Sequence, residues 1–139
     1  MIFLDTSFLH ALISKRDEHH QRVLDVVSGH SGKPLPDTLL TTNHVIAETL
    51  TLSRKLGHDV AVQLGRTLYA GELARVHWAT PEQEREAFGY FVRYDDKHYS
   101  FVDCLSFVVM EQFGIVTAWS VDDDFTHRFT AVPGPLRKR

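Results

Sequence analysis

The sequence is poor in the features that mark membrane and secreted proteins. It contains one cysteine, Cys104, among 139 residues, so no disulfide can form within the chain. No apolar run approaches the roughly 20 residues that a membrane-spanning helix needs. The N-terminus also lacks the basic segment, apolar stretch and cleavage site of a signal peptide. We therefore expect a cytoplasmic protein with no membrane association, in a reducing compartment.

A basic excess and a glycine-rich phosphate loop are also missing. The formal net charge is −3, so an RNA partner would require basic side chains gathered on a face away from any acidic cluster. Without a phosphate loop, nothing favours nucleotide-driven chemistry. The balance of 43% hydrophobic and 24% charged residues is that of a globular protein. We expect one domain at residues 1–132, followed by a basic tail at 133–139 that is either a solvated end or a phosphate-binding segment.

Short apolar runs alternate with amphipathic helices along the chain. The runs 2–4, 39–41, 76–79 and 115–119 predict strands, and 131–132 predicts a small edge strand. Strands separated by helices indicate parallel pairing through right-handed crossovers, and hence an α/β sandwich. The ends of the first and fourth strands should then be neighbours at the carboxyl edge of the sheet.

One helix has an unusually clear beginning. Thr80 is suited to the N-cap, a proline follows it, and Gln83 stands three residues after the cap. The apolar spacing in this helix predicts that it buries Phe88, Phe91 and Val92. Loop composition is expected at residues 31–36.

Five acidic residues stand in positions that suit a shared site. Asp5 follows the first strand, Glu48 lies within an apolar helical segment, Asp103 falls in the first turn of a helix, and Asp122 and Asp124 follow the fourth strand. Each alone has an ordinary explanation as a helix surface residue, a first-turn acid or a turn residue. Together at one sheet edge they would raise one another's pKa and would need a cation. Oxygen ligands without a thiolate or imidazole cluster favour Mg²⁺ or Mn²⁺ over zinc.

Four segments that contain these acids resemble the PIN domain and, within it, the VapC toxins of type II toxin–antitoxin pairs. The segments are 4–7 (LDTS), 42–48 (TNHVIAE), 99–106 (YSFVDCLS) and 119–125 (WSVDDDF). The resemblance extends over essentially the whole chain. It implies a PIN-like three-layer sandwich, with a central, mainly parallel sheet of four to five strands flanked by helices.

The same resemblance implies an Mg²⁺-dependent or Mn²⁺-dependent endoribonuclease that acts on tRNA or on the sarcin–ricin loop of large-subunit rRNA. It also implies a small VapB-like antitoxin as partner and a homodimer. The site residues that it implies are the acids Asp5, Glu48, Asp103 and Asp122, with Asp124 as a fifth; Asp5, Asp103 and Asp122 as metal ligands; and Thr6, Ser106 and Ser120 as supporting hydroxyls. Glu48 would position the attacking water.

Two other functions compete with this hypothesis. A metal-dependent phosphohydrolase would need a second acid two residues after Asp5, where the chain has Ser7. A non-catalytic PIN-like module would use its acids to bind a basic peptide, and the complete set of acids argues against it. His44 and His98 flank candidate acids and either contact RNA or are exposed polar residues, the second being favoured. Five aromatic residues can stack on bases, but their helical spacing favours core or dimer contacts: Tyr69, Phe88, Tyr90, Phe91 and Tyr94.

Overall fold

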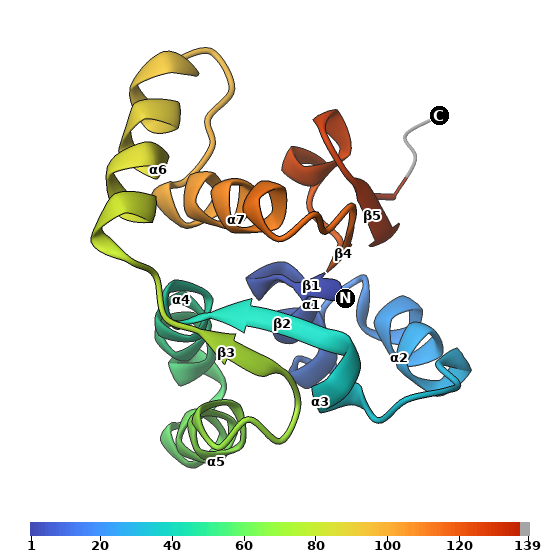
Figure 1. Ribbon diagram of the computed structural model, residues 1–139. Coiled ribbons are helices and arrows are strands. Elements are labelled where there is room, and N and C mark those ends of the chain that lie inside the picture. The colour runs from blue at the N-terminus through green and yellow to red at the C-terminus, as the bar shows by residue number, and fades with distance from the viewer. Residues whose placement is uncertain (137–139) are drawn as a thin grey trace.

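The computed structural model describes residues 1–136 and contains a five-stranded sheet in which every pair of neighbours is parallel. The strand order is β3-β2-β1-β4-β5, with β1 at the centre (Figure 1). The strands are β1 (Ile2–Leu4), β2 (Leu39–Thr42), β3 (Arg75–His77), β4 (Thr117–Ser120) and β5 (Thr130–Pro133). This sheet confirms the expected α/β fold, the small edge strand and the pairing of the first and fourth strands.

Helices cover both faces of the sheet. They are α1 (Thr6–Ile13), α2 (His20–Gly29), α3 (Leu35–Thr38), α4 (Asn43–Ser53), α5 (His58–Tyr69), α6 (Pro81–Arg93) and α7 (Phe101–Gln112), with short 3-10 turns η1 (Arg54–Leu56) and η2 (Asp123–His127). The single turn of α3 falls partly in the segment that we expected to be loop. Within the part of the chain that the structure describes, no helix is long and apolar enough to cross a membrane.

The order of the strands fixes which helices lie on which face. The chain moves from β1 through β2 to β3 in one direction, and then crosses back to β4 on the other side of β1. Right-handed crossovers therefore place α1, α2, α4 and α5 on one face and α7, with α6 packed against it, on the other (Figure 1). The direction reverses between β1 and β4, and the crevice beyond the strand ends at such a point is where α/β sheets bind ligands.

Aromatic side chains fill the core on both sides of β1 and β4. Phe8 of α1 stacks on Trp119 of β4 with ring centroids 5.0 Å apart. Phe125 contacts Phe107 of α7 at 5.2 Å and Phe3 of β1 at 6.4 Å. All four phenylalanines are fully buried. These contacts fix the ends of β1 and β4, and the segment that follows β4, against the helices.

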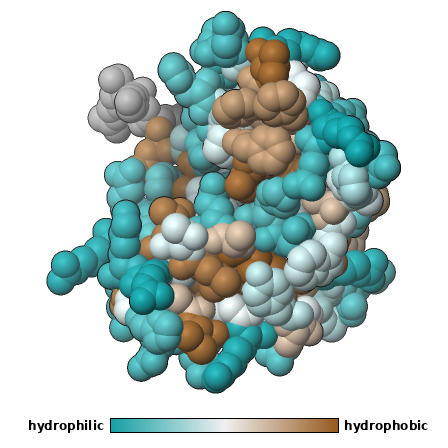
Figure 2. Space-filling model, turned by 90° about the vertical axis from the view of Figure 1, so that its left-hand side faces the viewer, coloured by the Kyte–Doolittle hydropathy of each residue, from teal (hydrophilic) through white to brown (hydrophobic). Residues whose placement is uncertain are grey.

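The beginning of α6 confirms the sequence-based prediction, but its buried face does not. Thr80 and Gln83 form the expected capping box. Phe88, Phe91 and Val92, which we expected to be buried, are 58%, 46% and 63% exposed. Figure 2 shows hydrophobic side chains on the surface in the upper part of the molecule, where α6 lies. That part of the prediction was wrong.

A polar residue occupies the buried face of α6 instead. Gln83 is 6% exposed, because its side-chain oxygen pairs with His77 at 2.7 Å and its amide donates to Gln112 at 2.9 Å. Helical spacing shows that apolar residues share a face, but not that a neighbour covers it.

The segment after β4 continues into the edge of the sheet. Gly134 N donates to Ser120 O at 2.9 Å, and the Arg22 guanidinium donates to the carbonyls of Pro133 and Gly134 at 3.0 and 2.7 Å. Residues 133 and 134, which we assigned to the tail, are therefore bonded to the domain. The three basic residues of the expected tail, Arg137, Lys138 and Arg139, lie outside the described residues.

Candidate active site

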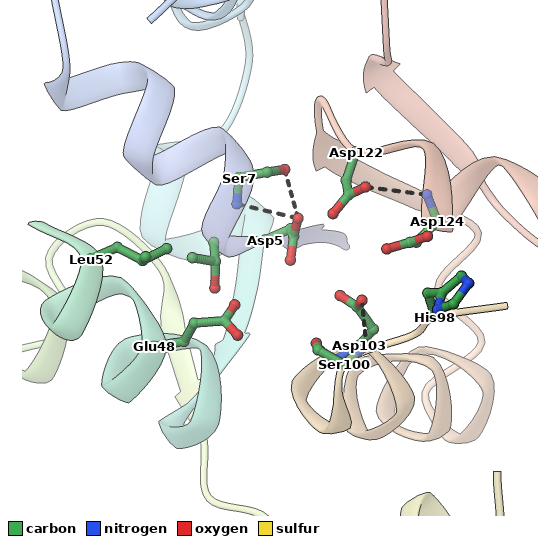
Figure 3. A pocket seen from close by; sticks show the side chains of 10 residues that line it. Asp5, Ser7, Glu48, Leu52, His98, Ser100, Asp103, Asp122 and Asp124 are labelled. Carbon is green, nitrogen blue, oxygen red and sulfur yellow. Dashed lines mark hydrogen bonds between the residues drawn. The ribbon is translucent and has the colours of Figure 1, made fainter. Parts of the chain in front are cut away.

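A pocket of about 310 Å³ opens at the carboxyl ends of β1 and β4, where the strand order reverses. Four separate segments of the chain contribute acids to it, and their side chains face one another across the pocket (Figure 3). The structure thus brings together all five acids that the sequence indicated, namely Asp5, Glu48, Asp103, Asp122 and Asp124.

Asp5 stands between β1 and α1 and serves as the N-cap of α1. Its Oδ2 accepts hydrogen bonds from Ser7 Oγ at 2.7 Å, Ser120 Oγ at 3.0 Å and Ser7 N at 3.3 Å. Burial raises the pKa of Asp5 to about 6; the serine hydrogen bonds oppose this rise, and the nearby Asp122 charge adds to it. Since these bonds all reach Oδ2, they orient the carboxylate while Oδ1 remains available to the pocket.

Asp103 is held by the first turn of α7. It forms a capping box with Ser100, in which Ser100 N donates to Asp103 Oδ2 at 3.1 Å and Asp103 N donates to Ser100 Oγ at 3.0 Å. Burial and then the Asp5 charge raise the pKa of Asp103 to about 8. The first-turn role that we considered as an alternative for Asp103 is therefore real, and the side chain also lines the pocket.

Asp122 and Asp124 belong to the turn that follows β4. Asp122 caps η2 by accepting from Asp124 N at 3.4 Å, and its own N–H donates to Ser120 Oγ at 3.0 Å. Burial and the Asp122 charge raise the pKa of Asp124. Asp103, Asp122 and Asp124 offer ligand atoms that all lie within 4.8 Å of one another. The most compact group of acids thus contains Asp124, where the sequence-based ligand set had Asp5.

Glu48 forms the opposite wall of the pocket. It projects from α4, whose first turn is fixed by Thr42 Oγ1 accepting from Val45 N at 3.1 Å. Glu48 is only partly buried and lies across the pocket from the aspartates (Figure 3). Like Asp5, it lies outside the compact group of three acids.

The hydroxyl residues divide into three kinds. Ser120 is fully buried; its hydroxyl donates to Asp5 and accepts from Asp122 N, so it supports the site. The Ser106 hydroxyl instead donates to Val102 O at 2.8 Å, and Ser106 does not line the pocket. Thr6 Oγ1 lines the pocket, is buried and has no hydrogen-bond partner among residues 1–136.

Sequence reasoning missed Ser7 as a supporting residue. Ser7 Oγ lies 3.0 Å from Ser120 Oγ, binds Asp5 and accepts from Val121 N at 3.1 Å, so it ties the ends of β1 and β4 together. A serine just after a helix N-cap is common, and only its spatial neighbours reveal this role. Sequence reasoning also did not place Leu52 and Ser100 in the lining, while His98, which it left with two alternatives, lines the pocket.

The donor set fits a hard divalent cation. Among the described residues, no lysine or arginine forms an ion pair with any of the five acids. Three of the acids have raised pKa values, as expected for buried carboxylates without a cationic partner. The buried Thr6 hydroxyl likewise has no hydrogen-bond partner among residues 1–136. Carboxylate and hydroxyl oxygens are the ligands that Mg²⁺ and Mn²⁺ prefer.

Comparison with known proteins agrees with this geometry. Residues 2–128 match the PIN domain family. The chain belongs to the PIN-domain family. The match spans all five acids, and PIN nucleases depend on metal ions.

Within the family, this PIN domain is similar to VapC toxins. It is 38% identical over 127 residues to the 23S rRNA-specific endonuclease VapC20 of two strains of Mycobacterium tuberculosis, covering 91% of this chain and 92% of VapC20. It also matches the crystal structure of M. tuberculosis VapC20, a sarcin–ricin loop cleaving toxin, with a TM-score of 0.80 and 35% identity over 91% of this chain and 94% of that one. This PIN domain is therefore a VapC-type endonuclease.

Proposed function

We propose that this VapC-type endonuclease is an Mg²⁺-dependent toxin that hydrolyses a phosphodiester bond in the sarcin–ricin loop of 23S rRNA. The observation that carries the proposal is the convergence of five carboxylates in one open pocket, where no lysine or arginine of residues 1–136 pairs with them. The similarity to VapC20, which is named for cleavage of that loop, supports this substrate over tRNA.

The aspartates would bind the cation, and Glu48 would accept the proton of the attacking water. Asp103, Asp122 and Asp124 form the compact group, and Asp5 presents its free Oδ1 beside them. A bound Mg²⁺ or Mn²⁺ would offset their charge and stabilise the negative charge that develops on the phosphate. Alanine at any of these positions would remove a ligand oxygen. The serines around Asp5 keep its carboxylate in one orientation.

Glu48 would serve as the base. From the opposite wall, a Glu48 carboxylate oxygen accepts a proton from the attacking water, the water oxygen bonds to phosphorus, and the bond from phosphorus to the 3′ oxygen breaks. The 3′ oxygen takes up a proton, so the products carry a 3′-hydroxyl and a 5′-phosphate. A base outside the ligand group can change its protonation state without losing the cation.

Two protein partners belong to this function. A small VapB-like antitoxin would place a basic side chain among the acids and so replace the missing counter-charge. A homodimer is supported by the exposed Phe88 and Val92 on α6, because exposed apolar stripes of this kind mark protein contacts. With ribosomal RNA as substrate, the enzyme would act in the cytoplasm.

The test uses an RNA hairpin with the sarcin–ricin loop sequence, incubated with the protein and Mg²⁺. Asp5→Ala and Asp103→Ala should abolish cleavage, while Asp25→Ala, an exposed acid on α2, should cleave like the wild type. Glu48→Gln should lose cleavage but still bind Mn²⁺ in calorimetry. Full activity in both aspartate variants would end the proposal, and cleavage of tRNA with the hairpin left intact would replace the substrate.

A further inference from the structure

A second pocket adjoins the acidic one. It has a volume of about 360 Å³ and is lined by Phe91, Tyr94, Asp95, His98 and Tyr99. His98 lines both pockets, so they share a wall. The volume lies at the small end of the usual range for ligand pockets, about 300–1,000 Å³. A group that occupies the second pocket would therefore lie directly beside a phosphate held at the acids.

The aromatic rings of this pocket are partly accessible to solvent and are held by contacts with other aromatic rings. Phe91 is 46% exposed and Tyr94 is half-buried, whereas Tyr99 is only 7% exposed. Tyr99 packs edge-on against Tyr94 at 6.0 Å and against Phe107 of the core at 5.0 Å. The ring of Tyr94 also stacks on Tyr90 at 5.7 Å. These contacts hold Tyr94 in place, so a ligand would not have to order it.

Positive charge accompanies these rings, in contrast to the acidic pocket. The guanidinium carbons of Arg93 and Arg128 each lie 6.0 Å from the centre of the Tyr94 ring. Arg128 is anchored by an ion pair with Glu111 at 2.6 Å and by a bond to the Tyr90 hydroxyl at 3.2 Å. The Asp95 carboxylate, also in the lining, can accept from an amino group. Aromatic faces with arginines next to them suit a flat, neutral ring attached to a phosphate backbone.

We propose that this pocket receives one unstacked RNA base next to the scissile phosphate, with Tyr94 and Phe91 as its stacking residues. Sequence-selective recognition of RNA relies on bases in loops that are splayed out and stacked on aromatic side chains. The inference rests on the proposed cleavage of RNA and adds to it the site that positions the nucleotide. Tyr94 and Phe91 thus select the bond to be cut, while the acids carry out the reaction.

The test compares alanine variants of matched residues. Phe91→Ala and Tyr94→Ala should each lower kcat/KM on the sarcin–ricin hairpin about tenfold. Phe113→Ala serves as the control, because Phe113 is a phenylalanine of similar exposure (49% against 46% for Phe91) that does not line the pocket. Tyr94→Phe should keep wild-type activity, because it retains the stacking ring. Circular dichroism checks that each variant is folded.

A change in the RNA links the pocket to a particular base. Hairpins with a single abasic nucleotide at each position around the cleaved bond are compared on wild type and Tyr94→Ala. At one position the abasic change should slow the wild type about tenfold and leave Tyr94→Ala almost unchanged, because both changes remove the same contact. Wild-type cleavage that is indifferent to abasic replacement at every position overturns the inference.

Binding of a labelled five-nucleotide single-stranded RNA, measured by fluorescence anisotropy with Ca²⁺, separates this inference from the proposed function. If the hairpin is not cleaved but Tyr94→Ala weakens binding of this RNA about tenfold, the proposed substrate fails and the base pocket stands. If Tyr94→Ala binds RNA like the wild type but changes the oligomeric mass in light scattering, the pocket is a contact between copies of the chain, and the inference is wrong.

Discussion

Replacing Asp5 by asparagine should stabilise the protein when no metal is present. Asp5 is buried, and its pKa rises from 3.8 to about 6, a difference of about 2.2 pH units. At 1.36 kcal/mol per unit, ionising this carboxylate costs the metal-free fold roughly 3 kcal/mol above pH 6. Asparagine keeps an oxygen that can accept from Ser7 and Ser120 and removes the charge.

The sign of the effect depends on pH. Well below the unfolded pKa of 3.8 the carboxyl is protonated in both the folded and the unfolded chain, so the cost is absent. It grows as the pH rises from 3.8 to the folded pKa of about 6 and is constant above that. In EDTA, Asp5→Asn should therefore raise the free energy of unfolding by up to about 3 kcal/mol at pH 7.5 and by roughly half as much at pH 5.

Urea unfolding followed by circular dichroism measures this difference. Adding Mg²⁺ should stabilise the wild type more than Asp5→Asn, because the neutral amide oxygen of the variant is a weaker ligand than the carboxylate. Ser106→Ala provides a comparison in which no charge changes near the site. If Asp5→Asn is less stable than the wild type in EDTA, by the same amount at pH 5 and pH 7.5, then burial of the Asp5 charge does not strain the fold and the reasoning fails.

Three further changes probe the same pocket. The pKa of Asp103 is about 8, and its carboxyl must lose a proton to bind a cation. The affinity for Mn²⁺, measured by calorimetry, should therefore rise by up to about tenfold per pH unit from pH 6 to 8 and then level off. An affinity that is constant over this range would contradict the prediction. Ser120→Ala removes a hydrogen bond to Asp5 and should lower the rate of hairpin cleavage about 10–100-fold. Ser106→Ala, whose hydroxyl bonds only to Val102 O, should cleave the hairpin at a rate within about threefold of the wild type. Equal losses of rate in the two variants would show that Ser120 does not orient Asp5. Thr6→Val removes a buried hydroxyl that has no hydrogen-bond partner among residues 1–136. It should raise the free energy of unfolding in EDTA by about 1–3 kcal/mol. A loss of stability would show that the hydroxyl has a partner.

The positions of the acids follow from rules that act locally. Asp5 and Asp122 come directly after strands, and parallel strands place their carboxyl ends at one edge, so their proximity could be predicted. The sequence predicts that Asp103 lies in the first turn of a helix, and its capping box with Ser100 holds it there. The position of Glu48 in the pocket could be predicted only together with the pairing of β2 and β1, because α4 begins where β2 ends. The resemblance to VapC toxins drew attention to the same four segments that carry these acids.

What the sequence did not reveal depends on contacts between distant segments. The exposure of Phe88 and Val92 depends on whether another surface covers α6, and the burial of Gln83 depends on its bonds to His77 and Gln112. The place of Asp124 in the compact group depends on the shape of the turn after β4. None of these is encoded in hydrophobic periodicity.

The central position of β1 has a consequence for synthesis of the protein. Asp5 is among the first residues made, yet its hydrogen-bond partner Ser120 lies 115 residues later, and the last acid of the pocket is Asp124. Contacts so distant in sequence close late in folding. A nascent chain that emerges from its N-terminus therefore carries an incomplete site until nearly the whole domain has left the ribosome. Products that terminate before β4 would lack Ser120, Asp122 and Asp124, and so could not form the complete site.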